Sequence, residues 1–376
     1  MEAEMKFACY ADRPLHVLNS VNFVWHNMEN SRGNTDLYLF KEFHGFPNME
    51  KALKESGVFR NVYLCKLPVA TAENAFMRVF TRAYGLFFPQ SALKQWCGTG
   101  VSFTGYDVLL FPAPVRCPIA LQDMNPNAKV WFIEEGSASY LGSISKKFTS
   151  KYRHLLYALF HKGPERVVPS RLFVNNVALC NNTECPVFPL PASNPDESDF
   201  ARLLENIFGS VGSNLIADGK IIFLSQPLEL MHIPRYEFGT ARSIFERTLS
   251  NLIPYRSKTI VRPHPREQRD DYQAFPVDKS GALWELLCSS TISDNHILIG
   301  AFSTAQLTPK LLYNKEPFVI FTCFLYSEIQ SSLNYDEIVP MIDALRVSYR
   351  NPQKIAAPKT WEEYQETIKC YVETRS

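Results

Sequence analysis

Short apolar segments that alternate with helical segments constrain the fold of this chain more than any other feature. Early in the sequence, strand-like segments separated by helix-like segments cover residues 7–10, 36–40, 62–65, 106–111 and 128–133. Strands joined through helices need crossover connections, which make neighbouring strands parallel in one sheet. The pattern therefore predicts a doubly wound α/β unit in the first part of the chain.

The same alternation begins again near residue 200. Strand-like segments cover residues 220–224, 259–262, 296–300 and 317–321, with helix-like segments between them. Residues 163–199 contain six prolines together with Asn and Ser, a composition typical of an interdomain linker. We therefore expect two α/β units, residues 1–199 including the linker and residues 200–376.

Composition and charge narrow the class of partner. The net charge of +1 over 376 residues gives no reason to expect nucleic acid. The nine cysteines are scattered, and Cys180 and Cys185 lack a second pair at zinc spacing, so we expect free thiols in a reducing compartment. The sequence shows neither the start of a signal peptide nor an apolar run of about 18 residues, which predicts a cytoplasmic protein.

A basic amphipathic segment over residues 146–162 leaves two interpretations open. It is either a solvated helix face over an apolar stripe or a peripheral contact with an anionic membrane surface or glycan.

The segment Pro-His-Pro-Arg is the first candidate for a site. Pro263 and Pro265 prevent both a helix and central-strand pairing, so His264 should stand where the strand 259–262 leaves the sheet. Ligands of open α/β sheets bind at that edge, and the flanking Arg262 and Arg266 suit a phosphate-bearing ligand. A surface loop with an incidental histidine is the alternative.

An acidic pair follows an earlier strand. Because neighbouring side chains on a strand point to opposite faces, one of Glu134 and Glu135 can face a site while the other supports the loop. A carboxylate in this place could take a proton from a hydroxyl. The alternative is a solvated acid pair at a turn.

Two hydroxyl residues, Ser303 and Thr304, follow the strand 296–300 at the start of a helix. Their Oγ atoms and the free backbone N–H groups could hold a phosphate there, although a plain N-cap also explains a serine in this place. Neither glycine-rich nucleotide motif occurs, and no Asp-x-Asp pair requires a divalent metal. Together the three strand ends predict transfer from a phosphate-linked donor to a hydroxyl.

These motifs, in this order, resemble those of the bacterial sialyltransferases. The closest match is glycosyltransferase family 52, the lipooligosaccharide and capsule sialyltransferases. The segments that carry the resemblance are Glu134 to Gly142, Pro263 to Arg266 and Phe302 to Thr308. The resemblance implies the GT-B fold, with two Rossmann-like domains facing each other across a cleft.

The resemblance further implies inverting transfer of sialic acid from CMP-sialic acid to a hydroxyl, such as that of a galactoside, without cofactor or metal. The acceptor would be a lipooligosaccharide or capsular glycan. A polysialyltransferase, a transferase of another CMP-sugar such as Kdo, and a non-catalytic glycan-binding protein are the alternatives. A homodimer is left open.

The roles of single residues also follow from the resemblance. His264 would act on the phosphate of the leaving CMP, and Glu285 would hold the nucleotide. The base is open between Glu135, which we favour, Glu134 and Glu229. Acceptor contacts are expected near Tyr10 to Pro14. The expected donor contacts are Ser303, Thr304, Pro265, Arg266 and Glu285.

Overall fold

The chain forms two compact units, Met1–Gly209 and Ser210–Ser376. The computed structural model describes residues 4–40, 43, 46–66, 84–85, 87–113, 115–140, 167–181, 184–191, 198–209, 215–226, 238–265, 267, 272, 274–326 and 335–374. Each unit is described by itself.

The N-terminal unit is built on a seven-stranded parallel sheet of order β3-β2-β1-β4-β5-β6-β7. Because both faces of such a sheet are covered, its strands read as nearly continuous apolar runs, and every residue of β1, β2 and β4 is buried. The strands are β1 (Phe7–Ala11), β2 (Thr35–Phe40), β3 (Asn61–Cys65), β4 (Val108–Phe111), β5 (Lys129–Ile133), β6 (Arg171–Val174) and β7 (Val187–Pro189).

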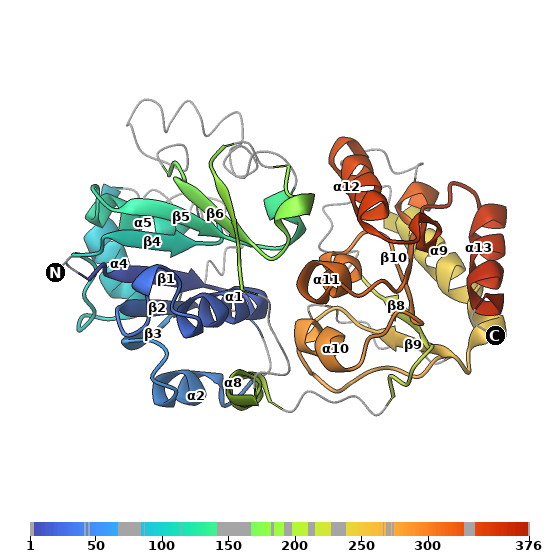
Figure 1. The fold of residues 1–376 in the computed structure, drawn as a ribbon, viewed down its shortest axis with the longest axis horizontal. Helices are drawn as coiled ribbons and strands as arrows, with labels where there is room; N and C mark the ends of the chain where they lie inside the picture. The colour runs from blue at the N-terminus through green and yellow to red at the C-terminus, as the bar shows by residue number, and fades with distance from the viewer. Residues whose placement is uncertain are drawn as a thin grey trace. The chain divides into compact units, whose positions relative to one another are not determined.

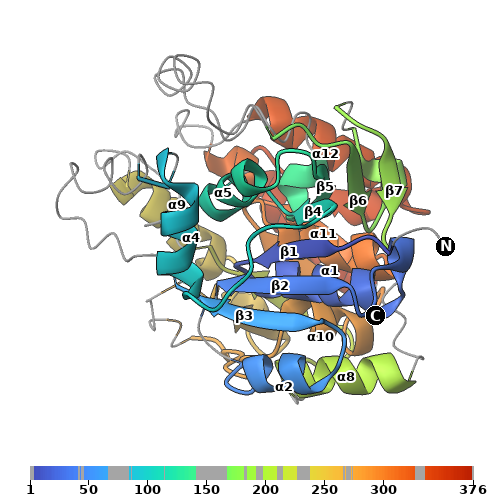
Figure 2. The same cartoon turned by 90° about the vertical axis from the view of Figure 1, so that its left-hand side faces the viewer.

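The described helices of this unit are α1 (Pro14–Trp25), α2 (Met49–Glu55), α4 (Pro89–Cys97), α5 (Arg116–Met124) and α8 (Ser198–Phe208). Both α1 and α4 begin with a proline, whose fixed φ suits the first turn of a helix. The connections β1–α1–β2 and β4–α5–β5 run in opposite directions across the sheet. Right-handed crossovers therefore place α1 and α5 on opposite faces. The helices α4 and α5 pack against each other (Figure 2).

Aromatic side chains fill the space between α1 and the sheet. The ring of Phe23 on α1 lies 5.1 Å from that of Phe173 on β6, and the ring of Phe7 on β1 lies 5.7 Å from that of Trp131 on β5. All four are buried, and aromatic rings at such distances contribute beyond their buried area. They fix α1 across the middle of the sheet.

The prediction that residues 163–199 form an interdomain linker is wrong. The described part of this segment contributes β6 and β7 to the N-terminal sheet. Both strands are short, and prolines surround them. Pro189 is tolerated within β7 because β7 is the last strand in the sheet order, where a missing N–H costs no central ladder bond.

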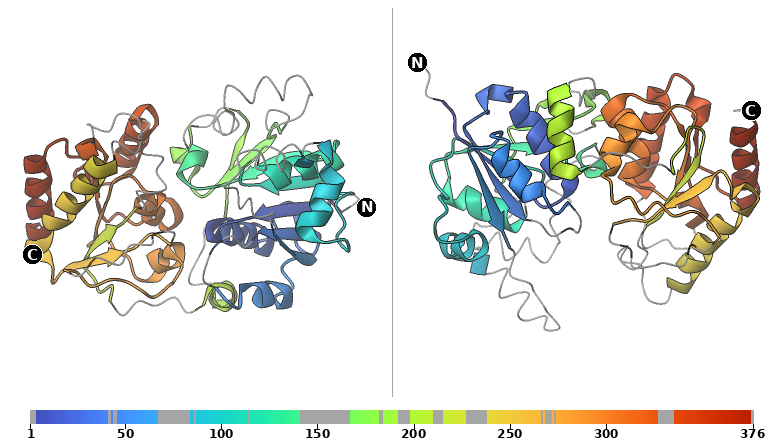
Figure 3. Two further views of the ribbon diagram at one scale, coloured as in Figure 1. Left: turned by 180° about the vertical axis from the view of Figure 1, so that it is seen from behind. Right: turned by 90° about the horizontal axis from the view of Figure 1, so that it is seen from below.

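The two units divide after Gly209, ten residues beyond the predicted boundary. The difference is α8, which belongs to the N-terminal unit and lies beside α2 (Figure 3). Phe200 on α8 packs against Trp25 and His26, with ring centroids 5.9 and 5.0 Å away. This contact ties α8 to the end of α1.

The C-terminal unit is built on a five-stranded parallel sheet of order β12-β11-β10-β8-β9. Its strands are β8 (Ile221–Leu224), β9 (Thr259–Arg262), β10 (Ile297–Gly300), β11 (Phe318–Phe321) and β12 (Ile355–Ala356). The described helices are α9 (Phe238–Ser250), α10 (Trp284–Ser290), α11 (Thr304–Tyr313), α12 (Tyr335–Ser348) and α13 (Trp361–Glu373). Figure 1 shows α10 and α11 on one side of this sheet and α9 and α13 on the other. The predicted α/β fold with two parallel sheets is confirmed.

Each sheet reverses its strand order once. In the N-terminal sheet β1 lies between β2 and β4, and in the C-terminal sheet β8 lies between β9 and β10. Ligands of open α/β sheets bind at such switch points, outside the carboxyl ends of the strands. The segments that follow β1, β8, β9 and β10 are therefore the first places to look for a site.

No helix within the described ranges is long and apolar enough to cross a membrane. The basic segment 146–162 lies outside the described residues.

Candidate functional site

The carboxyl edge of the C-terminal sheet begins with the turn from β10 into α11. Ser303 is the N-cap of α11, and its Oγ accepts a hydrogen bond from the N–H of Ala305 at 3.3 Å. Gln306 closes the capping box, because its Oε1 accepts from the N–H of Ser303 at 3.0 Å. The local role of Ser303 is thus the N-cap that the sequence left as an alternative. Thr304 is the first residue of the helix.

Gly300, the last residue of β10, permits a close approach of two neighbouring strand ends. A Cβ at this position would lie 3.1 Å from the carbonyl oxygen of Leu224 at the end of β8 and 3.1 Å from Oε1 of Gln306. Both distances are shorter than ordinary van der Waals contact. Glycine therefore lets the two strands on either side of the switch point, and the start of α11, pack closely.

Two residues after β8 tie the three strand ends together. Gln226 donates from Nε2 to the carbonyl of Phe302 at 2.6 Å and accepts from the N–H of Phe302 at 3.4 Å. Ser225 accepts at Oγ from the N–H of His264 at 3.1 Å. The turn after β8 is therefore bonded to the turn after β10 on one side and to the turn after β9 on the other.

Glu267 supports the His264–Pro265 turn. Ser225 donates from Oγ to one carboxylate oxygen of Glu267, the hydroxyl of Tyr272 donates to the other at 2.5 Å, and the N–H of His264 lies 3.3 Å from Glu267. His264 is half-buried and Pro265 is exposed. The histidine stands at the end of β9, where the two prolines placed it.

Arg262 does not face a ligand-binding position. Its guanidinium donates to Asp278 and to the carbonyl of Ala282 and lies over the ring of Trp284, 5.4 Å from its centroid. The pKa of the Asp278 carboxyl is lowered overall: burial raises it, but the charge of Arg262 lowers it by more. The expectation that Arg262 serves a phosphate is therefore wrong: Arg262 stabilises the segment before α10. The other flanking residue, Arg266, lies outside the described residues.

Glu285, on the first turn of α10, is half-buried. Burial raises its pKa, and the charge of Arg262 opposes that shift. Within the part of the chain that the structure describes, no hydrogen bond or ion pair joins Glu285 to the strand ends described above. Its role at a nucleotide stays a prediction from the sequence.

The two glutamates of the acidic pair after β5 have different partners and different structural roles. Glu134 is buried, and its Oε2 accepts hydrogen bonds from the hydroxyl of Tyr140 at 2.5 Å and from the N–H and Nδ2 of Asn175 at 2.8 and 2.9 Å. Glu135 pairs with Arg13 at 3.3 Å, with its side chain 11% exposed. One carboxylate thus supports the loop and the other faces the β1–α1 turn. Glu229, the third residue considered as a base, lies outside the described residues.

A polar network surrounds the end of β1, in the segment from Tyr10 to Pro14 where the sequence predicted acceptor contacts. The hydroxyl of Tyr10 donates to Oδ2 of Asp12 at 2.9 Å, and Nδ1 of His16 lies 2.7 Å from Oδ1 of Asp12. The His16 side chain is 2% exposed and that of Asp12 is 22% exposed. An Asp directly after an apolar strand, followed by Arg13 and Pro14, was the sequence signal for this turn.

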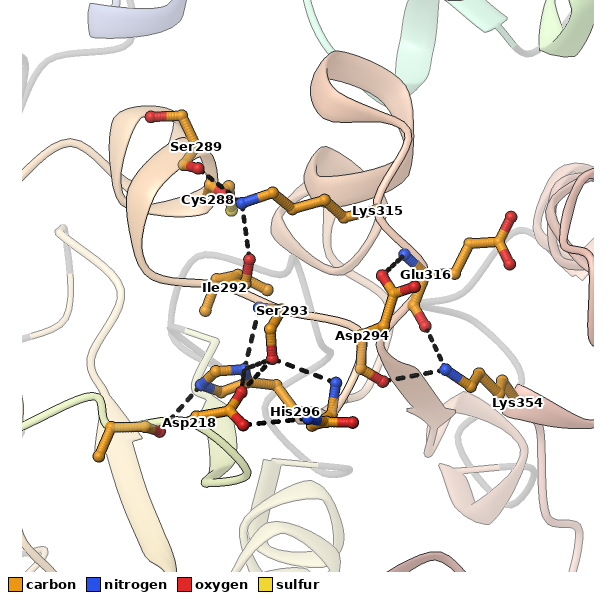
Figure 4. Close-up of polar contacts among 12 residues, drawn as sticks. Asp218, Cys288, Ser289, Ile292, Ser293, Asp294, His296, Lys315, Glu316 and Lys354 are labelled. Carbon is orange, nitrogen blue, oxygen red and sulfur yellow. Dashed lines mark hydrogen bonds and ion pairs between the residues drawn. The ribbon is translucent and has the colours of Figure 1, made fainter. Parts of the chain in front are cut away.

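The amino edge of the C-terminal sheet is polar too, but its groups bond one another. Lys315 donates from Nζ to the carbonyls of Cys288, Ser289 and Ile292 at 2.8, 2.6 and 2.7 Å, closing the end of α10 (Figure 4). Lys354 donates to the carbonyls of Asp294 and Glu316, both at 2.9 Å. This edge stabilises the unit.

His296 belongs to that amino edge and is fully buried. Its Nε2 lies 3.0 Å from the carbonyl oxygen of Ala217, and its Nδ1 accepts from the N–H of Ser293 at 3.0 Å. Both ring nitrogens therefore have structural partners, unlike those of a histidine that awaits a ligand. Across the described residues, no group of three or more His, Cys, Asp or Glu side chains could hold a metal ion, and all nine cysteines are free thiols.

No family model and no curated protein matches the sequence. Solved structures do match. A UDP-GlcNAc 2-epimerase from Methanocaldococcus jannaschii, in complex with UDP-GlcNAc and UDP, is 13% identical with a TM-score of 0.49, over 98% of this chain and 100% of the other. A UDP-GlcNAc 2-epimerase from Neisseria meningitidis, bound to UDP-GlcNAc, is 12% identical with a TM-score of 0.45, over 98% and 99%. A spinosyn forosaminyltransferase is 10% identical with a TM-score of 0.44, over 99% and 95%.

The two Rossmann-like units expected from the sequence agree with the two parallel, doubly wound sheets. Each of the three is named as an enzyme.

The identification as a bacterial sialyltransferase of family 52 is wrong. No model of that family matches, and the three solved structures reported above are named as UDP-GlcNAc 2-epimerases and a forosaminyltransferase. Three further expectations are wrong for the same reason. They are the donor CMP-sialic acid, the sialylated lipooligosaccharide or capsular product, and the alternative CMP-sugar donors. The motifs misled because each has a local structural use: Glu134 is a buried acceptor, Ser303 caps a helix, and the prolines around His264 end a strand.

Proposed function

We propose that the protein is a glycosyltransferase that takes a sugar from a nucleoside diphosphate and transfers it to a hydroxyl. The C-terminal unit would bind the phosphates of the donor at the carboxyl edge of its sheet. The fold supports this proposal, because the switch point beside β8 is where a doubly wound sheet receives a nucleotide.

The observation that carries the proposal is the bonding among the turns after β8, β9 and β10. Gln226 holds the start of α11 through Phe302, and Ser225 holds the turn of His264. A helix N-terminus and a histidine from two different strand ends are thereby fixed to one short segment. A site whose parts are cross-bonded in this way is preorganised, so little ordering is needed when a ligand binds.

The chemistry of these groups suits a leaving phosphate. The N-terminus of α11 carries a partial positive charge that favours an anion, and this helix has ten residues. A histidine can hydrogen-bond or protonate a phosphate oxygen near neutral pH. His264 and the turn of Ser303 and Thr304 would stabilise the negative charge that develops as the bond from the sugar to the phosphate breaks.

The test is nucleotide binding by the full chain, followed by a search for transfer. UDP and UDP-GlcNAc are the first probes, because a solved structure with this fold contains both; GDP and ADP follow. Calorimetry should give saturable binding, and mass spectrometry with a panel of saccharide acceptors should find a product heavier by one sugar. Conversion of the donor to its 2-epimer without any acceptor would instead identify an epimerase.

A matched pair of serines locates the site. Ser225→Ala removes the hydroxyl that holds the His264 turn and should weaken nucleotide binding about fivefold, as expected for the loss of roughly 1 kcal/mol. Ser293→Ala removes a hydroxyl that is also hydrogen-bonded, at the amino edge of the same sheet, and should leave binding unchanged. Equal effects of the two substitutions, or no nucleotide binding by the wild type, would refute the proposal.

A further inference from the structure

Three cysteines from three different elements of the N-terminal unit lie together. Cys65 is the last residue of β3, Cys97 is the last residue of α4, and Cys117 lies in the first turn of α5. The helix α4 packs against both β3 and α5 (Figure 2). All three cysteines are buried free thiols. The fold thus gathers three thiols that are scattered in the sequence.

Cys97 is at the centre of this group. The thiols of Cys117 and Cys65 each form a hydrogen bond with its sulfur. The Sγ of Cys65 also lies 3.5 Å from the carbonyl oxygen of Tyr63 on the same strand. A buried free cysteine usually acts as a small apolar side chain, and such a side chain needs no sulfur partner. Two sulfur contacts at one cysteine therefore go beyond what packing requires.

The backbone holds Cys65 and Cys97 beside each other. The N–H of Lys66 donates to the carbonyl of Trp96 at 2.8 Å. The N–H belongs to the peptide group that follows Cys65, and the carbonyl belongs to the peptide group that precedes Cys97. A disulfide forms without movement of the backbone only where the two Cα atoms lie close and the side chains point toward each other. The backbone bond supplies the first condition, and the contact between the two thiols supplies the second.

The neighbouring thiols favour the reactive form of Cys97. Hydrogen bonds from Cys117 and Cys65 lower the pKa of Cys97, and they outweigh burial, which raises it. The bond to Cys97 raises the pKa of Cys65, and burial raises that of Cys117, so both stay thiols. Cys97 is also the most exposed of the three, at 8% against 2% for Cys65 and 1% for Cys117. Because the thiolate is the nucleophilic form of cysteine, Cys97 is the residue that would react first.

We propose that Cys97 is a site of reversible oxidation by a peroxide and that the product is a disulfide with Cys65. This inference does not depend on the proposed transferase function. Cys117 is a positioning residue, which keeps Cys97 ionised through its hydrogen bond.

The reaction has two steps. The Cys97 thiolate attacks one oxygen of the peroxide, the O–O bond breaks, and the other oxygen takes up the proton that Cys97 had released and leaves as water or an alcohol. Cys97 then carries a sulfenic acid. The sulfur of Cys65 attacks the sulfur of Cys97, and the Cys65 proton leaves with the hydroxyl group as water. Two thiols thereby lose two electrons and two protons to the peroxide, and a dithiol reverses the bond by exchange.

The test is a tryptic map of the full chain, because each of the three cysteines falls in a different tryptic peptide. These peptides are residues 61–66, 95–116 and 117–129. The reduced protein is treated with a slight excess of hydrogen peroxide, its remaining thiols are alkylated in denaturant, and it is digested without reductant. We expect peptides 61–66 and 95–116 to be joined, lighter by two hydrogens than the two together, and to separate again in dithiothreitol. No cross-link, or one that leaves 61–66 out, would overturn the proposal.

Two substitutions and a matched control assign the roles. Cys97→Ser should abolish the cross-link, whereas Cys370→Ser, at an exposed thiol of α13, should leave it unchanged. Cys117→Ala removes one hydrogen bond to the thiolate. It should move the midpoint of the pH profile for alkylation of Cys97 upward by about one pH unit. An unchanged midpoint would show that Cys117 only fills space.

The melting temperature gives a second measurement on the wild type, so the proposal stays testable if Cys97→Ser fails to fold. The disulfide would close a ring of the chain between residues 65 and 97 and would join segments that already lie together. The oxidised protein should therefore melt at a higher temperature than the reduced protein. A lower melting temperature after oxidation would mean that the bond distorts the fold, which would contradict the placement of the two thiols.

Discussion

Replacing Glu134 tests whether the acidic pair supports the fold or performs chemistry. One carboxylate oxygen, Oε2, accepts hydrogen bonds from the hydroxyl of Tyr140 and from two nitrogens of Asn175, and the side chain is buried. In Glu134→Ala these three donors would lose their acceptor in a place that water reaches poorly. We expect this variant to be strongly destabilised, whatever its activity.

The size of the effect follows from the number of bonds. A hydrogen bond to a charged group contributes about 1.5–3 kcal/mol, but three bonds to one oxygen are not additive. Each buried donor left without an acceptor costs about 1–3 kcal/mol, so we expect about 4 kcal/mol in total for Glu134→Ala. That corresponds to a fall in the melting temperature of about 10 °C for a unit of this size. Glu134→Gln can place its amide oxygen where Oε2 lies and should cost about half as much or less.

The assay is denaturant unfolding of the full chain, followed by tryptophan fluorescence and circular dichroism. The matched control is Glu135→Ala, which removes only the contact with the half-exposed Arg13 and should cost about 0–1 kcal/mol. If Glu134→Ala stayed within about 1 kcal/mol of the wild type, Glu134 would not be the structural acceptor described above. Full stability together with lost transfer would instead return Glu134 to a catalytic role.

Two further predictions concern the C-terminal unit. Gly300→Ala should destabilise it by about 1–3 kcal/mol, since the new Cβ would press on Leu224, whereas Gly239→Ala, at an open position in α9, should be neutral or stabilising. A second substitution, Glu316→Gln, removes a carboxylate whose pKa is lowered overall. Burial raises this pKa, but Lys310, 2.7 Å away, and Arg350 lower it by more. Because its folded pKa lies below the unfolded value, its stabilisation is present above about pH 4.5 and is lost as pH falls through the folded pKa. Unfolding from pH 7 to 3 should show the gap between wild type and Glu316→Gln narrowing; a constant gap would contradict the reasoning.

The sequence predicted the strands well where apolar, β-branched runs stand between helices. The segments 7–10, 36–40, 259–262 and 296–300 match the observed strands within one residue at each end. It missed β6 and β7, because four and three residues among prolines carry too little periodicity to distinguish a strand from a linker. Strand order was also beyond reach, since pairing depends on contacts between residues far apart in the sequence.

The sequence predicted which strand ends form the candidate site, but not the hydrogen bonds that join them. The prolines around His264 were enough to place it at the end of β9. The bond from Ser225 to Glu267 joins residues 42 positions apart, and nothing local to either residue signals it. Asp12 lies in the segment from Tyr10 to Pro14 where acceptor contacts were expected, but the sequence did not distinguish it within that segment, because a single acidic residue after a strand is common. Only the nearby His16 and Tyr10 side chains, seen in the folded chain, distinguish it.

The polar face of α1 has a mechanical consequence. Asn19 donates to the carbonyl of Glu134 at 3.0 Å, and Asn22 donates to the carbonyl of Pro191 at 2.8 Å, both from buried side chains. A slide of the helix by one turn, about 5.4 Å, would break both of these hydrogen bonds. An apolar helix face tolerates such slippage far better. A displacement of the turn that holds Asp12 should therefore move α1 as a rigid body, including its last residue, Trp25, which packs against α8.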